Sequence, residues 1–343
     1  MKKQLNTLYV TLPNAYLSLD GETVVVCQDN EIAGRVPLHN LESIVCFGYK
    51  GASPALMGKC AQDHIGLCFL TQHGRFLARI SGSVSGNVLL RTTQYQWAQT
   101  QEKSVDIARV MLLGKIYNGR WCLERVKRDH PMRVDQQLIG SSIGQLLQSI
   151  EMLRTADSRD TLMGVEGIAA KAYFAAFNEM ILRNEDDFYF DGRNRRPPLD
   201  PVNAMLSFTY TLLGNEIVGA LETVGLDPAV GFLHSLRPGR NSLALDLLEE
   251  LRAPLADRFV LSQINIGAVT GSDFSQKENG AFYLKDDARK KFLAAWQKRK
   301  QETLMHPYLK EKVQWGMVPY AQAMLLARYI RGDLDAYPPF LWK

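Results

Sequence analysis

The chain has 343 residues, a formal net charge of +4, and a composition that is 46% hydrophobic. This length exceeds one typical domain and supplies ample apolar material for a core, so two domains are expected. No apolar run is long enough for a signal peptide or a membrane span, which excludes a membrane-spanning chain and predicts a cytoplasmic protein. So small a net charge does not by itself require a polyanionic partner.

The first eighty or so residues are predicted to form a β-rich domain, because short β-branched or alternating runs alternate with turn residues. A short helix and a hairpin turning at His73 and Gly74 complete it. The predicted strands are residues 7–12, 16–27 with a turn at Asp20 and Gly21, 31–38 and 42–48, the helix is 54–63 and the hairpin 65–80.

Five cysteines stand in apolar surroundings at irregular spacing, without a CxxC pair. An odd number at such spacing favours reduced, buried thiols over a disulfide framework or a zinc site. They are Cys27, Cys46, Cys60, Cys68 and Cys122.

Composition changes at residues 81–87, SGSVSGN, a glycine- and serine-rich run typical of a linker. The segments that follow show apolar residues at three- and four-residue spacing over lengths typical of helices; they are 104–129, 140–156, 161–182 and 201–225. We therefore predict an α+β chain. Its parts are a β-rich, β-sandwich-like N-terminal domain (1–82), a linker with the start of the first helix (83–90) and a larger all-α domain (91–343).

Glu166 lies in a predicted helix among small and apolar residues and has no lysine four positions later. Burying an unpaired carboxylate costs several kcal/mol, so Glu166 should have a cation or a hydrogen-bonding partner. A metal ion is one such partner. The alternative is that Glu166 stands at the edge of the apolar stripe and faces water.

A second group of polar residues begins at His234, which ends an apolar stretch and precedes a turn. A lone histidine is more often a structural residue than a ligand. In the next predicted helix, Asp246 and Glu249 are three positions apart and share one face. That face is either a solvated acidic surface or part of a divalent metal site, for which carboxylates and a neutral imidazole are suitable ligands.

Basic residues cluster in three places and suit contacts with a phosphate backbone. Solubility alone is the alternative, and for the late helix the two interpretations are equally good because acids are interleaved there. The residues chosen as DNA contacts are Arg193, Arg195 and Arg196 before two prolines, Arg237, Arg240 and Arg252 around the acidic helix, and Lys285 and Arg289 in the late helix.

Several separate segments resemble one family, the CRISPR-associated adaptation integrases (Cas1). They are GVEGIAAKAYF, DPVNAMLSFTYTLL, the run from Gly225 to Val260 and the closing AQAMLLARYIRG. The resemblance covers nearly the whole chain and keeps the family's order of motifs. Within the family, the chain resembles the subtype I-C branch. It implies metal ligands at Glu166, His234 and Glu249, with Asp246 as a further acid of the catalytic set. Whether Asp246 or Glu249 binds the metal directly stays open.

The resemblance also implies the activity and the partners. Such enzymes are endonucleases and integrases that use Mg²⁺ or Mn²⁺: the 3′ hydroxyl of a captured DNA fragment attacks a phosphodiester of a CRISPR repeat, with the ion activating the nucleophile and stabilising the leaving oxygen. Implied partners are double-stranded prespacer and repeat DNA, a second copy of the chain through the N-terminal domain, a small ferredoxin-like CRISPR protein in a heterohexamer, and an iron-sulfur nuclease. A non-catalytic DNA-binding scaffold and, more weakly, a small-substrate phosphoesterase are the alternatives.

Overall fold

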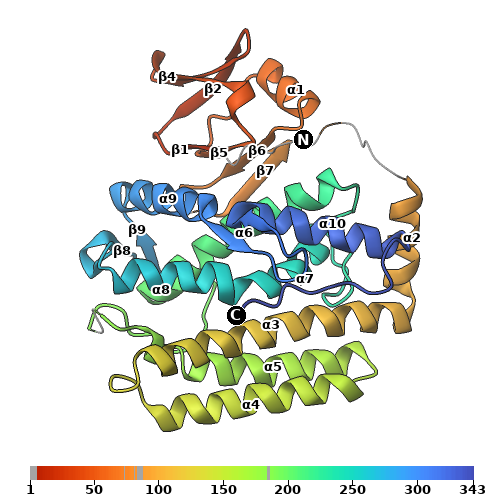
Figure 1. Ribbon diagram of the computed structural model, residues 1–343. Helices are drawn as coiled ribbons and strands as arrows, with labels where there is room; N and C mark the ends of the chain where they lie inside the picture. The colour runs from red at the N-terminus through yellow and green to blue at the C-terminus, as the bar shows by residue number, and fades with distance from the viewer. Residues whose placement is uncertain (1–5, 73, 81, 83–87, 184–185) are drawn as a thin grey trace. The chain divides into compact units, whose positions relative to one another are not determined.

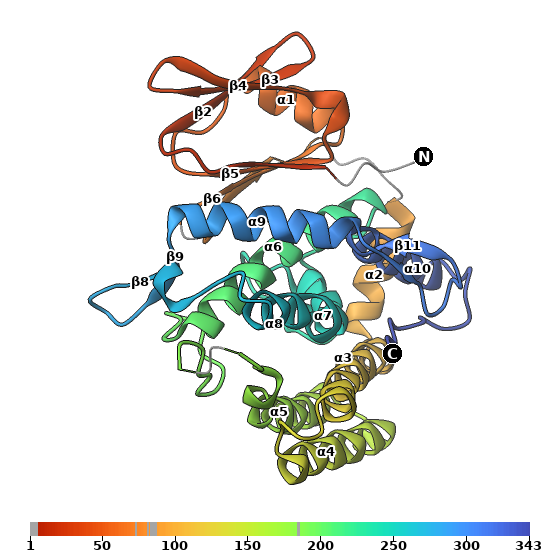
Figure 2. The ribbon, with the colours of Figure 1, turned by 60° about the vertical axis from the view of Figure 1, so that its left-hand side comes forward.

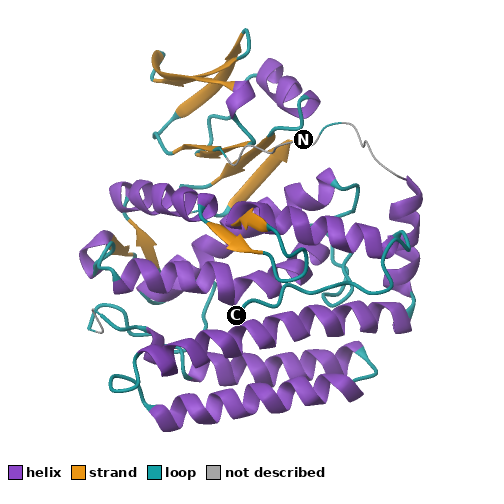
Figure 3. Cartoon of the chain, viewed as in Figure 1, coloured by secondary structure: helices purple, strands orange, loops and turns teal. Residues whose placement is uncertain are grey.

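The computed structural model describes residues 6–72, 74–80, 82, 88–183 and 186–343, which divide by their contacts into two compact units. Strands dominate the first unit and helices the second (Figure 3), which confirms a β-rich N-terminal part followed by a mostly helical one. Residues 83–87 of the predicted linker lie outside the described residues. The first unit comprises Met1–Gly86, Leu284–Thr303 and Gln314–Met317, and the second Asn87–Tyr283, Leu304–Val313 and Val318–Lys343.

The first unit contains two sheets (Figure 1). In the four-stranded sheet, of order β1-β5-β6-β7, β5 is parallel to β1 and β6, and β7 is antiparallel to β6. The other sheet is an antiparallel meander of three strands. The bounds are β1 Thr7–Val10, β2 Ala15–Asp20, β3 Thr23–Gln28, β4 Glu31–Pro37, β5 Ser43–Phe47, β6 Gly66–Leu70 and β7 Phe76–Ile80, with η1 at Leu38–Asn40 and α1 at Pro54–Gln62.

One hydrophobic cluster joins both sheets and α1. Leu17 and Val24 come from the meander, Ile44 and Leu67 from the four-stranded sheet, and Leu56 from α1, and all of them are fully buried. Such apolar burial is the main stabilising contribution to a unit of this size. The sandwich-like packing of the two sheets stays a prediction.

The helix α9, Asp286–Gln301, belongs to the first unit although it lies late in the sequence. Arg289 donates to the backbone carbonyl of Gln72, and the ammonium of Lys300 lies 3.2 Å from Thr7 Oγ1. The first unit therefore combines the N-terminal residues with a segment from late in the sequence.

The second unit is built mainly from helices. Figures 1 and 2 both show α3, α4 and α5 side by side, and each of these three helices packs against the other two. Among the described residues, no helix is long and apolar enough to cross a membrane. The bounds are α2 Val88–Gln99, α3 Gln101–Asp129, α4 Gln136–Thr155, α5 Arg159–Ala175, η2 Asn178–Met180, α6 Pro201–Thr223, α7 Ser242–Leu251, the π-helical η3 Arg252–Asp257, α8 Arg258–Asn265, η4 Gly271–Asp273 and α10 Val318–Ile330. The short helix η5, Trp315–Met317, belongs to the first unit.

The prediction that the domain at 91–343 is all-α is wrong in detail. Two small two-stranded sheets occur there, β8 Phe274–Gln276 with β9 Phe282–Leu284, and β10 Thr303–Met305 with β11 Lys312–Gln314. Strands of three residues are too short for alternation to be recognised in a sequence.

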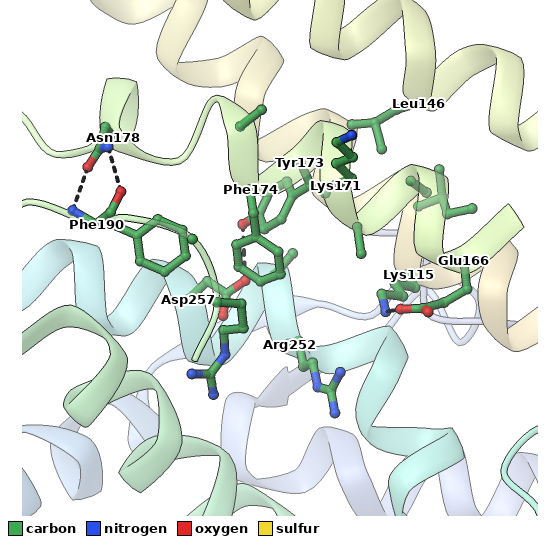
Figure 4. A pocket seen from close by; sticks show the side chains of 18 of the residues that line it. Lys115, Leu146, Glu166, Lys171, Tyr173, Phe174, Asn178, Phe190, Arg252 and Asp257 are labelled. Atoms are coloured by element: carbon green, nitrogen blue, oxygen red, sulfur yellow. Dashed lines mark hydrogen bonds and ion pairs between the residues drawn. The ribbon is translucent and has the colours of Figure 1, made fainter. Parts of the chain in front are cut away.

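The helix α5 ends earlier than its periodicity predicts, at Ala175 rather than at residue 182. The amide side chain of Asn178 donates to the carbonyl of Phe190 and accepts from its N–H, at 2.8 and 2.9 Å (Figure 4). A side chain that pairs with the backbone of another segment competes with helix continuation. At its other end α5 begins at Ser158, whose hydroxyl accepts from Thr161 N–H.

The position of α7 is fixed by Glu250, which is buried beside the last residues of the chain. Its carboxylate accepts from Tyr337 Oη and Phe340 N–H, both at 2.8 Å, and from Gln322 Nε2 at 3.0 Å. Asn118 of α3 donates to the Glu250 carbonyl. Although these bonds partly offset it, burial raises the pKa of Glu250 to about 7. The residue before it, Glu249, is therefore carried on a firmly anchored helix.

Candidate active site

Two of the predicted acids converge on one cation. The ammonium of Lys115, on α3, forms an ion pair with Glu166 of α5 and lies 2.7 Å from Glu249 Oε2 of α7 (Figure 4 shows the first pair). Three helices far apart in the sequence thus meet at one charged point. Glu166 has the cationic partner that its apolar surroundings require, and that partner is a lysine.

Glu249 is the more buried of the two acids, with a side chain that is 4% exposed. Burial alone would raise its pKa, but the charges of Arg252, 2.7 Å away, and of Lys115 outweigh burial and lower the pKa to about 2. The charge of His234 also lowers the pKa of Glu249. Glu249 is therefore an anion at any physiological pH.

Asp246 and His234 form a second pair. Asp246 Oδ1 lies 2.7 Å from His234 Nδ1 and accepts the His234 backbone N–H at 2.9 Å, while Oδ2 accepts the backbone N–H groups of Phe232 and Leu233 at 2.6 and 3.0 Å. A carboxylate has about four lone-pair sites, and all four are used here. Because the carboxylate accepts, Nδ1 carries the proton and Nε2 is left as the free lone pair.

The turn that carries His234 approaches Asp246 closely enough to need a glycine. A Cβ on Gly231 would lie 2.6 Å from Asp246 Oδ2 and 2.7 Å from the Ser242 carbonyl carbon. No other residue leaves room for the backbone to wrap around the carboxylate at this distance. Gly231 and Asp246 together fix where the imidazole stands.

Among the residues that the structure describes, no group of three or more histidine, cysteine, aspartate or glutamate side chains is arranged to hold a metal ion. An ammonium stands between the carboxylates of Glu166 and Glu249. Two carboxylates that already converge on a cation form a donor set suited to Mg²⁺ or Mn²⁺. The residues present therefore fit a divalent ion.

A cavity of about 660 Å³ opens beside the acids (Figure 4), and Lys115, Glu166 and Arg252 are part of its wall. Its remaining wall is aromatic and basic rather than apolar alone, with Arg193, Arg195, Lys171, Tyr173, Tyr189, Tyr210 and Phe174 among its residues. Cationic and aromatic walls suit phosphates and bases.

A buried carboxylate organises this wall. Asp257 accepts from Tyr210 Oη at 2.5 Å and from Tyr173 Oη at 3.0 Å, and burial raises its pKa. The guanidinium groups of Arg193 and Arg252 lie 5.2 and 5.1 Å from the Tyr210 ring centroid, which is cation–π distance. Arg252 and Asp257 are the two ends of the π-helical η3, a form often found at functional sites.

The residues predicted as DNA contacts lie in different surroundings. Arg195, Arg196, Arg237 and Lys285 are exposed and Arg240 is half-buried. Arg193 donates to Asn203 and Ser207, and Arg252 is paired with Glu249, so both hold the protein together. Arg289 is 2% exposed and bonded to Gln72, which leaves it no surface for a phosphate.

Lys115, Asp257, Tyr173 and Tyr210 belong to this site but were not predicted from the sequence. Lys115 stands alone in the apolar run MLLGKIYNGRW. A lone lysine within an apolar run requires a partner when it is buried. This pattern is the sequence signal that could have identified Lys115. For the two tyrosines and Asp257 the local sequence carries none.

Comparison with known proteins places the chain in a family. The model of the family described as CRISPR associated protein Cas1 matches residues 8–298. The CRISPR-associated endonuclease Cas1 1 of Chlorobaculum tepidum is 50% identical over 343 residues, covering 100% of both chains. The endonuclease Cas1 2 of Rhodospirillum rubrum is 49% identical over 347 residues, with the same coverage.

Solved structures agree on the fold. A casposase bound to its integration product superposes with a TM-score of 0.84 at 23% identity, covering 98% of this chain and 94% of that one. The fold and the relatives of 50% and 49% identity define an endonuclease. The chain belongs to the Cas1 family of CRISPR-associated endonucleases.

Two further matches come from larger proteins. A Cas4 exonuclease/Cas1 endonuclease fusion of Geobacter sulfurreducens is 35% identical over 340 residues, which are 98% of this chain and 60% of the fusion. A chain in a Cas6-RT-Cas1–Cas2 complex has a TM-score of 0.83 at 22% identity and is covered over 36% of its length.

Proposed function

We propose that this protein is a metal-dependent endonuclease and integrase of CRISPR adaptation, which inserts foreign DNA fragments into a CRISPR array. The observation that carries the proposal is the convergence of Glu166 and Glu249 on one cation, together with an imidazole whose Nδ1 is held by Asp246, on the same helix as Glu249. Full-length relatives that are 50% and 49% identical support the same activity.

We assign Glu166, Glu249 and His234 Nε2 as the ligands of Mg²⁺ or Mn²⁺. Asp246 is not assigned as a ligand, because its acceptor sites are filled by His234 and by the turn that carries it. Asp246 acts through His234 as a positioning residue. Hydrogen-bond capacity therefore supports Glu249 rather than Asp246 as the direct ligand.

The bound ion supplies the nucleophile's activation and the charge neutralisation that phosphodiester transfer needs. The chain's own residues supply geometry. Asp246 keeps the proton on His234 Nδ1, so that Nε2 keeps its lone pair, and Arg252 keeps Glu249 ionised. The 3′ hydroxyl of a fragment attacks a repeat phosphodiester, forms the new P–O bond and displaces a 3′ oxygen of the repeat; water in place of the hydroxyl gives endonuclease cleavage.

Phosphate contacts are proposed for the exposed arginines near the site. Arg195 and Arg196 precede α6, and Arg237 and Arg240 follow His234 directly. Arg195 also lines the cavity. Lys285 remains a proposed contact in the first unit, whereas Arg289 is omitted because it is buried.

We further propose the partners and the subtype. The chain would form a homodimer through its N-terminal unit and join a small ferredoxin-like partner in a heterohexamer, for which the Cas1–Cas2 complex of a structural neighbour is the support. The fusion of a Cas4 exonuclease to one relative supports a nuclease partner, with subtype I-C as the proposed branch and the prokaryotic cytoplasm as the proposed location.

The test is strand joining of a fluorescent DNA duplex with free 3′ hydroxyls into a repeat-containing plasmid, with Mn²⁺ or with EDTA. Glu166→Gln and His234→Ala should each abolish joining, and EDTA should do the same to the wild type. Glu151→Gln, the same chemical change at an exposed position on α4, is the matched control and should join normally.

Retained joining by Glu166→Gln would overturn the ligand assignment. A wild-type protein that binds DNA tightly but joins nothing, even with the small partner added, would favour the non-catalytic scaffold instead.

A further inference from the structure

We infer that Lys115 is a built-in counter-ion that occupies the place of the divalent ion in the metal-free protein and yields it when the ion binds. The inference rests on the metal site proposed above. It adds a residue with two states to that site, and it predicts how tightly the ion is held.

The geometry assigns this position to Lys115. Its side chain is 16% exposed and its ammonium contacts carboxylates from two different helices, Glu166 of α5 and Glu249 of α7. Two carboxylates that approach one point repel each other unless a cation stands between them. The ammonium is therefore what allows α5 and α7 to present both acids in the absence of a metal.

Charge balance requires that something change when the ion enters. Lys115 and Arg252 carry two positive charges against the two negative charges of Glu166 and Glu249. A divalent ion adds two positive charges to a group that is already neutral. Unless Lys115 or Arg252 moves away, their positive charges strongly repel the divalent ion in this partly buried site.

Lys115 is the cation that can move. Arg252 is held by its pair with Glu249 at 2.7 Å and by the ring of Tyr210 at 5.1 Å. Lys115 instead reaches the acids through one ammonium at the end of a flexible four-carbon stem. It also lines the cavity that Arg195 lines, so a displaced ammonium stays beside the space proposed for DNA phosphates.

This arrangement makes Lys115 a competitor of the metal. Charge-assisted hydrogen bonds to buried carboxylates have to be broken before the ion is bound. Removing the ammonium should therefore tighten Mn²⁺ binding and lower the stability of the metal-free protein. Lys115→Met should lower the Kd for Mn²⁺ about tenfold or more, the equivalent of one such bond.

The experiment is a calorimetric titration of the full chain with Mn²⁺, together with melting curves in EDTA and in saturating Mn²⁺. In EDTA, Lys115→Met should have a lower melting temperature than wild type. Saturating Mn²⁺ should raise the melting temperature of Lys115→Met by more than it raises that of the wild type. Lys171→Met is the matched control, because Lys171 is an exposed lysine on the wall of the same cavity. Its Kd should equal that of the wild type.

The outcomes separate this inference from the proposed function. If wild type binds Mn²⁺ and Lys115→Met binds it equally or more weakly, the role of Lys115 is overturned and the metal site stands. If neither protein binds Mn²⁺, both are overturned. An equal tightening in Lys171→Met overturns a specific role for Lys115, because any nearby positive charge would then suffice.

A second measurement uses wild type alone and does not depend on the folding of a variant. Amine acetylation followed by mass spectrometry should show that Mn²⁺ raises the labelling rate of Lys115, which is released from two carboxylates, and leaves that of Lys171 unchanged. Unchanged labelling of Lys115 in saturating Mn²⁺ would overturn the displacement.

Discussion

The Nδ1 atom of His234 lies 2.7 Å from Oδ1 of Asp246, and the same carboxylate binds the backbone of the turn that carries the histidine. One buried aspartate thus determines both the position of the imidazole and the nitrogen that carries its proton. Metal-binding histidines commonly donate their other N–H in this way. Asp246 therefore serves the histidine, and Glu249, one helical turn later, is the acid that we propose as the ligand of the ion.

Replacement of Asp246 by asparagine should impair joining although the side chain keeps its size. The amide nitrogen of asparagine carries two hydrogens and cannot accept the N–H hydrogen bonds that the carboxylate accepts. His234 therefore loses its orientation. We expect joining to fall about ten- to hundredfold and the Kd for Mn²⁺ to rise similarly. Joining rates and calorimetry measure both effects. Asp129→Asn, at the exposed end of α3, should leave the joining rate and the Kd for Mn²⁺ unchanged. Equal losses in this control would contradict a specific role for Asp246.

Tyr210→Phe tests the carboxylate behind the cavity wall. The change removes one of the two hydroxyl groups that Asp257 accepts from, and Asp257 is 1% exposed. An unsatisfied buried carboxylate oxygen costs about 1–3 kcal/mol, which urea unfolding should register. DNA binding should persist, because the ring that Arg193 and Arg252 contact remains.

Tyr189 provides the control for that change. It lines the same cavity but is 65% exposed, so Tyr189→Phe should alter the free energy of unfolding by less than about 0.5 kcal/mol. A loss at Tyr189 as large as that at Tyr210 would show that burial of Asp257 is not the cause.

Much of the helical unit could be predicted because its signal is local. Residues 104–129 have apolar positions at helical spacing, and α3 spans Gln101–Asp129. The end of α5 could not be predicted, since Asn178 is diverted by a backbone pairing with Phe190, 12 positions away. The membership of α9 in the first unit could not be predicted either, because it depends on contacts such as that between Arg289 and Gln72, 217 positions apart.

The same limit applies to the site. Glu166 could be recognised from the sequence because an acid among small apolar residues needs a partner, and His234 and Glu249 because a family resemblance marked them. That the partner of Glu166 is Lys115, 51 positions earlier, is a property of helix packing alone. Asp246 and Glu249 share one predicted helical face, and their contacts distinguish them: Asp246 accepts from the turn, whereas Glu249 pairs with Lys115 and Arg252.

The exposed arginines should contribute to DNA binding through salt-dependent phosphate contacts. For the double variant Arg195→Gln and Arg196→Gln, the slope of log K against log salt should become shallower by about 0.9 per arginine. Fluorescence anisotropy with a prespacer duplex at several salt concentrations measures the slope. Arg154→Gln, on exposed α4, should keep the wild-type slope. An unchanged slope in the double variant would exclude both arginines as contacts.

Stability should depend on pH through His306, which is fully buried. Burial lowers the pKa of His306 below its ordinary value of 6.5, and Nδ1 accepts the Leu309 N–H at 3.2 Å. As pH falls below about 6.5, the unfolded chain binds a proton that the folded chain refuses, so the free energy of unfolding decreases, by at most about 1.4 kcal/mol per pH unit.

The variant His306→Asn isolates this contribution, since asparagine can accept from Leu309 but does not titrate. The difference in unfolding free energy between wild type and variant should be constant from pH 8 to about 7 and then shift against the wild type as the pH is lowered further. Urea unfolding at a series of pH values provides it, and the other histidines cancel in the difference. A difference that stays constant down to pH 5 would mean that His306 is protonated equally in the folded and unfolded chains, in conflict with its burial against Phe340, whose ring lies 5.5 Å away.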